Sequence, residues 1–294
     1  MHPPTYLLLP LTSSIAYVFA VMMLKRLSVW GVDVWRITFV SNLAIAIAFA
    51  PCWLLGGDLR STAQFWQPLT AAVLFLAGQV FSFLALQYGD VSVGTPVMGL
   101  KIVLVALGSS FLLPEPVPLR WWIAAVLSTL AIALLACGKS RPRHAPGLTV
   151  LTAALAAASF ALFDVLVQKW SPEWGVGKFL SLLFGALAVL SFGFVPLFAA
   201  PLRAVPRMAW GWLAGGSLLL ALQALLFVYA VGAFGDATAM NIVYSSRGLW
   251  SVLTVWLLGH WFASEEQTLA PSLLRSRLGG AVLMLAAIVL VVIR

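Results

Sequence analysis

Three charged residues lie deep inside long apolar stretches of this chain: Lys101, Asp164 and Arg247. A charge near the middle of a lipid bilayer costs about 2.5–3.5 kcal/mol on insertion scales, so such residues mark functional sites by default. Lys101 is far from both ends of its apolar stretch, which leaves its side chain little chance of reaching the membrane surface. The three residues are therefore the first candidates for chemistry.

Lys101 and Arg247 suit the binding of an anion. A guanidinium binds a carboxylate or phosphate through two parallel hydrogen bonds, whereas an ammonium acts as a point charge. Two cations that face one cavity repel each other unless an anion lies between them. The pair predicts a site for an anionic substrate group. The alternative is structural: Asp164 would hold Arg247, and carbonyls at a helix end would hold Lys101.

Asp164 has Phe160 one helical turn before it and Gln168 one turn after it, so the three share one helix face. A carboxyl group removed from water titrates nearer neutral pH, which makes Asp164 the candidate for coupling transport to a proton. It would otherwise form a buried ion pair with Arg247 that fixes helix packing. Both interpretations account for an intramembrane acid.

Further polar residues at helical spacing are candidates for the wall of the same cavity. An arginine inside the membrane must face something polar, which favours a cavity around it. The alternative is that these hydroxyl and amide groups only bond neighbouring helices together. The predicted substrate-binding residues are Lys101, Arg247, Tyr244, Asn241, Ser251, Gln79, Gln223 and Tyr17.

The elements that position these side chains must lie in a membrane. Of the 294 residues, 62% are hydrophobic and only 9% are charged, whereas a soluble domain carries about 25% charged residues. In water such a chain would expose large apolar surfaces and aggregate. Tryptophans gather near the ends of apolar runs, where an aromatic belt meets the lipid headgroups.

A spanning helix needs roughly 20 apolar residues, and by that rule the chain predicts ten spans joined by short linkers. We therefore expect an all-α integral membrane protein with no separate soluble domain. The ten spans are expected at 6–26, 34–55, 66–88, 92–113, 119–137, 147–169, 176–198, 209–231, 236–258 and 273–293.

Short motifs recur in the same order at nearly constant spacing, which indicates a duplicated chain. Chance similarity between two apolar sequences is the alternative, because short motif matches carry false positives. The matched pairs are Trp30-Gly31-Val32 with Trp174-Gly175-Val176, Gly89-Asp90 with Gly235-Asp236, and Lys101 with Arg247.

The duplication predicts two five-helix repeats, residues 1–140 and 141–294, in one integrated membrane domain. An odd number of spans per repeat inverts the second repeat relative to the first, as in many secondary transporters. Substrates of such folds bind at the repeat interface near mid-membrane. Asp90 and Asp236 each follow a glycine at the start of a span and are expected to cap helices.

The whole chain resembles the EamA-type branch of the drug/metabolite transporter superfamily. The second span opens with Trp35-Arg36-Ile37-Thr38-Phe39, similar to the family's Leu-Arg-Phe start, and Tyr88 to Ser92 form the very short link between spans three and four. Leu112-Leu113-Pro114-Glu115 and Leu257-Leu258-Gly259-His260 are variants of the family's Leu-Gly-Glu ending.

The resemblance implies basic substrate-binding residues in spans four and nine, because superfamily members that move phosphorylated sugars have them there. It also implies a multi-pass protein of the bacterial inner (plasma) membrane. This chain departs from the family in two respects. Ile102 and Gly248 occupy the places where a proline usually lies midway along spans four and nine, and His260 stands where the family has a Glu at the end of span nine.

These features predict a secondary active transporter that moves a small organic metabolite by alternating access, with an anionic group on the substrate favoured. The first alternative is an exporter of amino acids or of cationic or neutral drugs. The second is a non-transporting membrane scaffold or sensor, in which the intramembrane charges would pair internally without a solvent-reachable cavity.

Other functional classes lack support in the sequence. It contains no phosphate-binding glycine loop, His-Glu-x-x-His zinc site or paired-carboxylate motif, so neither an enzyme nor a cofactor is expected. The net charge of +8 forms no basic stripe, so no nucleic-acid partner is expected. The expected partners are a small solute, a proton or counter-substrate, and the lipid bilayer. Monomer and homodimer both remain open.

Overall fold

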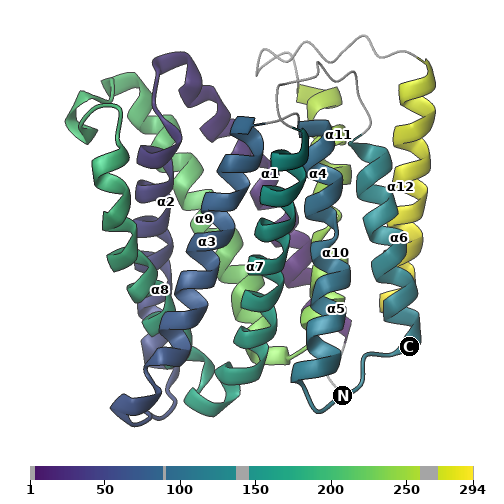
Figure 1. Cartoon of the computed structure of the whole chain (residues 1–294), viewed down its shortest axis with the longest axis horizontal. Helices are drawn as coiled ribbons and strands as arrows, with labels where there is room; N and C mark the ends of the chain where they lie inside the picture. The colour runs from purple at the N-terminus through teal and green to yellow at the C-terminus, as the bar shows by residue number, and fades with distance from the viewer. Residues whose placement is uncertain (1–3, 89–90, 137–145, 259–270, 294) are drawn as a thin grey trace.

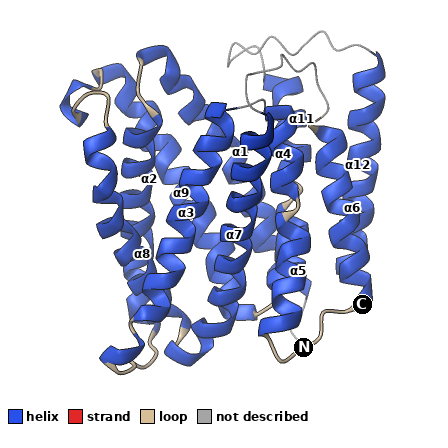
Figure 2. Cartoon of the chain, in the orientation of Figure 1, coloured by secondary structure: helices blue, strands red, loops and turns tan. Residues whose placement is uncertain are grey.

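The computed structural model describes residues 4–88, 91–136, 146–258 and 271–293. These residues form helices joined by short loops and contain no strand (Figure 2). The all-helical class expected from hydropathy is therefore confirmed. The helices run side by side as a bundle, and both termini lie at the same end of it (Figure 1).

Helical structure covers each of the ten expected spans. The α-helices are α1 Leu8–Lys25, α2 Val34–Phe49, α3 Trp66–Tyr88, α4 Val91–Gly99, α5 Lys101–Leu112, α6 Leu119–Leu135, α7 Pro146–Trp174, α8 Val176–Ser191, α9 Arg207–Phe234, α10 Ala237–Tyr244, α11 Arg247–Leu258 and α12 Pro271–Val292. Short 3₁₀ helices are η1 Pro4–Leu7, η2 Arg26–Trp30, η3 Ala50–Leu55, η4 Thr62–Gln64, η5 Phe192–Leu197 and η6 Leu202–Ala204.

Eight helical segments of the described chain are long and apolar enough to cross a membrane. α6 is apolar but has 17 residues, which at 1.5 Å per residue falls slightly short of a hydrocarbon core of about 30 Å. The expected span 236–258 is divided into α10 and α11. The membrane class is thus supported by eight candidate spans rather than by all ten.

Two expected spans are interrupted immediately before their basic residue. α4 and α5 meet at Leu100, and α10 and α11 meet at Ser245 and Ser246. At each junction a backbone N–H bonds three residues back, from Leu100 to Val97 and from Ser246 to Val243. These tightened turns place Lys101 and Arg247 at the first position of a new helical segment.

The two interruptions differ in their sequences. Pro96 lies inside α4, where it removes one backbone donor and crowds the turn before it rather than the turn at Leu100. No proline lies in α10 or α11. There the Ser245 hydroxyl donates to the Ile242 carbonyl, and such local bonds compete with the regular helix ladder.

Asp236 does not cap α10 as expected. Its side chain makes no capping hydrogen bond, and instead its carboxylate accepts a hydrogen bond from the Tyr6 hydroxyl. The Tyr6 ring stacks on Phe234 with centroids 5.2 Å apart. Asp90, its counterpart in the first repeat, lies outside the described residues. The contact joins the N-terminal segment to the α9–α10 junction.

Asp33 caps α2 and anchors Arg36. Its carboxylate accepts from the Arg36 backbone N–H at 3.0 Å and pairs with the Arg36 guanidinium, whose side chain is 4% exposed. Burial raises the pKa of Asp33, but the hydrogen bonds and charge of Arg36 outweigh it, and the pKa lies below its ordinary value of 3.8. Asp33 therefore stabilises the folded state above that pH, and the contribution is lost as the pH falls through the lowered value.

The Asp33→Ala variant is expected to lose about 1–2 kcal/mol of stability, because a helix cap disappears and a buried guanidinium loses its partner. Thermal unfolding of the purified protein in detergent measures the loss. Thr12→Ala is the control, since its hydroxyl bonds only to the Leu8 carbonyl on an exposed helix face. Equal melting temperatures for parent and Asp33→Ala would contradict the capping role.

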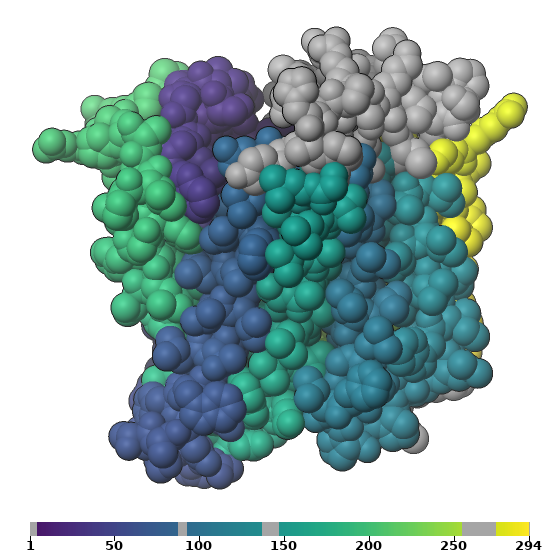
Figure 3. Space-filling view, in the orientation of Figure 1, coloured from purple at the N-terminus to yellow at the C-terminus, as the bar shows by residue number. Residues whose placement is uncertain are grey.

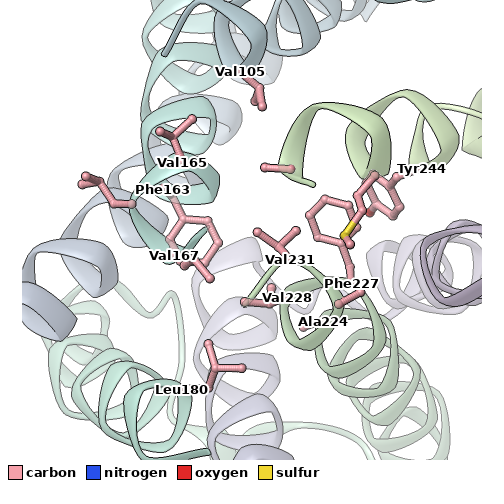
Figure 4. Packing of buried hydrophobic residues seen from close by; sticks show 14 of the residues in the cluster. Val105, Phe163, Val165, Val167, Leu180, Ala224, Phe227, Val228, Val231 and Tyr244 are labelled. Carbon is pink, nitrogen blue, oxygen red and sulfur yellow. The ribbon is translucent and has the colours of Figure 1, made fainter. Parts of the chain in front are cut away.

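The core lies where helices of the two expected repeats meet. The most extensive packing is between α3 and α7, between α1 and α9, and between α6 and α12. Figure 4 shows Val167 of α7 near Val228 and Val231 of α9, whereas Val165 of α7 lies toward Val105 of α5. The viewed face in Figure 3 is an unbroken wall formed largely by α3, α7, α5 and α6. Exposed apolar side chains on these helices, such as Phe111 and Leu119, suit contact with lipid.

Candidate functional site

The charged centre of the bundle is an ion pair between Lys101 of α5 and Asp164 of α7. The Lys101 Nζ lies 2.8 Å from the Asp164 Oδ2, and the two side chains are 17% and 2% exposed. The Asn241 amide of α10 donates to the same oxygen at 2.7 Å and also donates to the Ala237 carbonyl at 3.0 Å. Three helices thus converge on one carboxylate oxygen.

Aromatic rings surround the lysine. The Lys101 Nζ lies 5.7 Å from the Phe160 ring centroid and 5.4 Å from that of Phe227. Ring faces attract a cation within about 6 Å, by about 0.5–2 kcal/mol. The rings and the carboxylate together offset part of the cost of a buried ammonium. Phe160 lies on the helix face of Asp164, as its spacing predicted.

Arg247 has a different environment, made of tyrosines. Its guanidinium carbon lies 4.9 Å from the ring centroids of both Tyr17 and Tyr244. Its Nη1 donates to the Tyr244 hydroxyl at 3.4 Å, and that hydroxyl donates to the Gln223 Oε1 at 3.3 Å. In the described part of the chain no carboxylate forms a salt bridge with Arg247.

A small cavity separates the two basic residues. Its volume is about 20 Å³, which is room for about one water molecule. The first expected repeat contributes mainly apolar walls and the second contributes polar ones. The lining residues are Met98, Gly99, Lys101, Ile102 and Ile132 from the first, and Asn241, Tyr244, Ser245 and Arg247 from the second.

Seven of the nine predicted site residues gather here. Four line the cavity, and three contact the lining residues directly. The lining residues are Lys101, Asn241, Tyr244 and Arg247, and the contacting ones are Asp164, Gln223 and Tyr17. One proposed pairing was wrong: Asp164 forms its salt bridge with Lys101 and not with Arg247.

Gln79 and Ser251 do not join the cluster. Gln79 of α3 exchanges two hydrogen bonds with Asn42 of α2, at 2.8 and 3.0 Å, and Asn42 also donates to Ser191 of α8. The Gln79 amide therefore joins α3 to α2 by hydrogen bonds. Ser251 lies one turn after Arg247 on α11, but its side chain is exposed and it does not line the cavity.

Sequence reasoning missed several lining and supporting residues. Met98 and Ile132 line the cavity but are apolar residues in apolar helices, so no pattern distinguishes them. Phe227 could have been found, since it lies one turn after Gln223 on the same face of α9. The bond between the Ser14 and Ser246 hydroxyls, 3.0 Å long, ties α1 to the α10–α11 junction. No sequence signal indicated that pairing.

Comparisons with known proteins agree with this architecture. Residues 4–137 match the model of the EamA-like transporter family. The chain is 28% identical over 246 residues to Protein PecM of Dickeya dadantii (strain 3937), covering 81% of this chain and 77% of that protein. A protein crystal structure superposes with a TM-score of 0.77 over 98% of both chains, at 16% identity, which supports the fold alone. The first part of the chain, residues 4–137, therefore matches the EamA-like transporter family, in agreement with the resemblance seen in the sequence.

Proposed function

We propose that the protein is a secondary active transporter that moves a small organic anion by alternating access around the cavity at Lys101 and Arg247. One observation carries the proposal: Arg247 lies partly buried in the bundle against two tyrosines, without a carboxylate that forms a salt bridge with it in the described chain. A guanidinium held inside a membrane bundle without an anion is costly. A substrate carboxylate or phosphate would supply the missing charge and accept its hydrogen bonds.

We further propose ten membrane crossings in two inverted repeats, residues 1–140 and 141–294. Helix packing supports this proposal, because two of the most extensive contacts between the halves have counterparts when the halves are exchanged. α1 packs on α9 as α7 packs on α3, and α2 packs on α9 as α8 packs on α3. Both termini lie at one end of the bundle, as an even number of crossings requires (Figure 1).

The backbone at matched positions gives separate support to the duplication. Gly31 and Gly175 both have positive φ angles, 64° and 77°. The interruptions at Leu100 and Ser246 also fall at matched positions, each directly before the basic residue. Local backbone geometry that recurs with the sequence motif argues against chance similarity. The bacterial relative supports a bacterial inner membrane as the location.

Asp164 is the proposed site of proton coupling. While ionised, Asp164 forms a salt bridge with Lys101 at 2.8 Å, so the charge of Lys101 is not available to a substrate. Protonation of Asp164 would remove that attraction and leave Lys101 available to an anion. Proton uptake and anion binding would then favour each other. Exchange for a counter-substrate is the other proposed driving reaction.

Alternating access requires this cavity to widen, since about 20 Å³ holds no organic solute. One contact that must open lies at the end of the bundle near the N-terminus, where Tyr6 donates to Asp236 and stacks on Phe234. It joins the first repeat to the second. If these groups separated, a solute could reach the site from that end of the bundle.

Transport by the purified protein in liposomes tests the proposal. We expect saturable uptake of a labelled organic carboxylate, and an Arg247→Ala variant is expected to lower uptake about ten- to a hundredfold. The reason is that a hydrogen bond to a charged group contributes about 1.5–3 kcal/mol. Arg203→Ala is the matched control, because Arg203 is exposed on the short helix η6 and does not line the cavity. Uptake of cations alone, unaffected by Arg247→Ala, would contradict an anion site.

A non-transporting scaffold or sensor is the second candidate, and two observations favour it. The Lys101–Asp164 pair is internal, and the cavity is small. This candidate predicts a folded protein that binds no solute and carries no flux in the same assay. An exporter of cations is less favoured, because Lys101 already occupies the acid that a cation would need.

A further inference from the structure

We infer that the site selects substrates with one net negative charge and an apolar body, of which monocarboxylates are the simplest class. The inference rests on the proposed function and narrows it from anions in general to monoanions. It comes from the charge of the buried cluster, the lining of its cavity and the contacts of Arg247.

The buried cluster has a net charge of +1. Arg247 keeps its proton in any protein environment. Lys101 and Asp164 share one salt bridge, and the pair sums to zero whether its proton lies on the nitrogen or on the oxygen. The remaining contacts of Arg247 are neutral groups of Tyr17, Tyr244 and Gln223. The sum therefore stays at +1 until the pair gains a further proton.

The helices α3, α4, α8 and α9 do not alter this count. α3 and α4 pack against α7 and contain no Asp, Glu, Lys or Arg. In α9 the only charged residue is Arg207, at its first position. In α8 the only one is Lys178, which bonds to the Gly57 carbonyl near one end of the bundle. Among the described residues of these four helices, none brings a charge to the cluster.

A single negative charge is the complement of such a cluster. In the low dielectric of the bundle an unbalanced charge is costly, and a monoanion brings the total to zero. A neutral ligand would leave +1, and a dianion would leave −1 unless the cluster also took up a proton. A phosphate monoester, which carries nearly two charges at neutral pH, is therefore disfavoured.

The side chains that line the cavity determine which ligand body fits beside the anionic group. Met98, Ile102 and Ile132 supply apolar surface on one side, and the Phe160 and Phe227 rings lie beside Lys101. A hydroxyl-rich solute would leave its polar groups without partners against these side chains. A carboxylate at Arg247 with a hydrocarbon or aromatic body satisfies both parts of the site.

The parent and three variants differ in the net charge of the cluster by known steps. The parent carries +1, Lys101→Met carries 0, Asp164→Asn carries +2, and the double variant returns to +1. Asparagine keeps an oxygen that accepts from Asn241. Methionine keeps the length of the lysine stem without its charge. The double variant separates the effect of net charge from the loss of either side chain.

Dissociation constants for benzoate, phthalate, benzamide and benzylamine, measured by calorimetry near neutral pH, test the inference. The parent and the double variant are expected to bind benzoate at least about tenfold more tightly than phthalate or benzamide. Asp164→Asn is expected to shift the preference toward the dianion phthalate, and Lys101→Met is expected to lose the preference for benzoate over benzamide.

The outcomes separate this inference from the proposed function. If the parent prefers phthalate, or if the double variant does not recover the preference for benzoate, selection of a monoanion is wrong while an anion site stands. If only benzylamine or benzamide binds the parent, the anion site itself fails. Should Asp164→Asn not fold, the parent and the double variant still decide between a monoanion and a dianion.

Discussion

The Asp164→Ala variant is expected to be about 3–5 kcal/mol less stable than the parent, because it leaves the buried ammonium of Lys101 without its counter-ion. The carboxylate is 2% exposed and lies 2.8 Å from the Lys101 Nζ. The Asn241 amide loses its acceptor as well. Thermal or denaturant unfolding in detergent micelles measures the change.

A double-mutant cycle isolates the ion pair from other effects of the substitution. Replacing both residues with apolar ones of similar size, as in Lys101→Met with Asp164→Leu, removes both charges together. Such replacements of buried pairs are often neutral or stabilising. The double variant should therefore recover most of the lost stability. A double variant as unstable as Asp164→Ala would show that the pair itself is not the source of the loss.

The second large effect is expected at Gly175, between α7 and α8. Its φ is +77°, and a Cβ there would lie 2.4 Å from the Gly57 Cα. A non-glycine residue at such a backbone conformation costs about 1–3 kcal/mol, and the overlap costs about as much again. Gly175→Ala should therefore lose about 4 kcal/mol of stability in the same unfolding measurement.

Gly31 is the matched control, because it occupies the corresponding position of the first repeat. Its φ is +64°, but a Cβ there would meet no atom within 4 Å. Gly31→Ala should cost only about 1–2 kcal/mol, from the left-handed backbone alone. Equal losses at the two glycines would mean that the contact with Gly57 contributes nothing to stability.

The contact at Gly175 matters because it joins the two halves of the chain. The Asp58 N–H donates to the Trp174 carbonyl at 3.0 Å, and the Arg60 guanidinium donates to the Glu173 carbonyl at 2.8 Å. The loop that follows η3 therefore docks on the α7–α8 junction. Two backbones approach this closely only because both positions are glycine.

Hydropathy predicted the helices well because a lipid environment demands long apolar segments with satisfied backbones. The expected limits of α3, 66–88, agree with Trp66–Tyr88, and those of α12 differ by no more than two residues. The interruptions before Lys101 and Arg247 were not predicted. Neither Ile102 nor Gly248 is a helix breaker like the family's proline, and the cause at Ser245 is a local hydrogen bond.

The sequence predicted most residues of the site but not which of them form the ion pair. Depth in the membrane identifies Lys101, Asp164 and Arg247 as one group, since each must avoid lipid. Which cation reaches Asp164 depends on helix rotation and on the distance between axes, and a single sequence does not encode these. The same limit explains Gln79, whose polar group could face the cavity or α2 and bonds to Asn42 of α2.

Ser251 shows a further limit of reasoning from periodicity. It was assigned to one polar face with Tyr244 and Arg247 on the assumption of one continuous helix through the ninth span. The structure divides that span at Ser245 and Ser246, and Ser251 is exposed. The tightened turn lies between Tyr244 and Ser251, so helical spacing counted across it does not define one face.

A crystal structure of the protein with 4-iodobenzoate tests whether the cavity at Lys101 and Arg247 binds an anion, because the anomalous signal of iodine locates the ligand independently of its shape in the density. We expect one anomalous peak in the widened cavity between Lys101 and Arg247, with the carboxylate within about 3 Å of the Arg247 guanidinium. Its iodine should lie toward Met98 and Ile132. An iodine peak elsewhere in the bundle, or a carboxylate that avoids Arg247, would contradict the assignment of this cavity as the anion site.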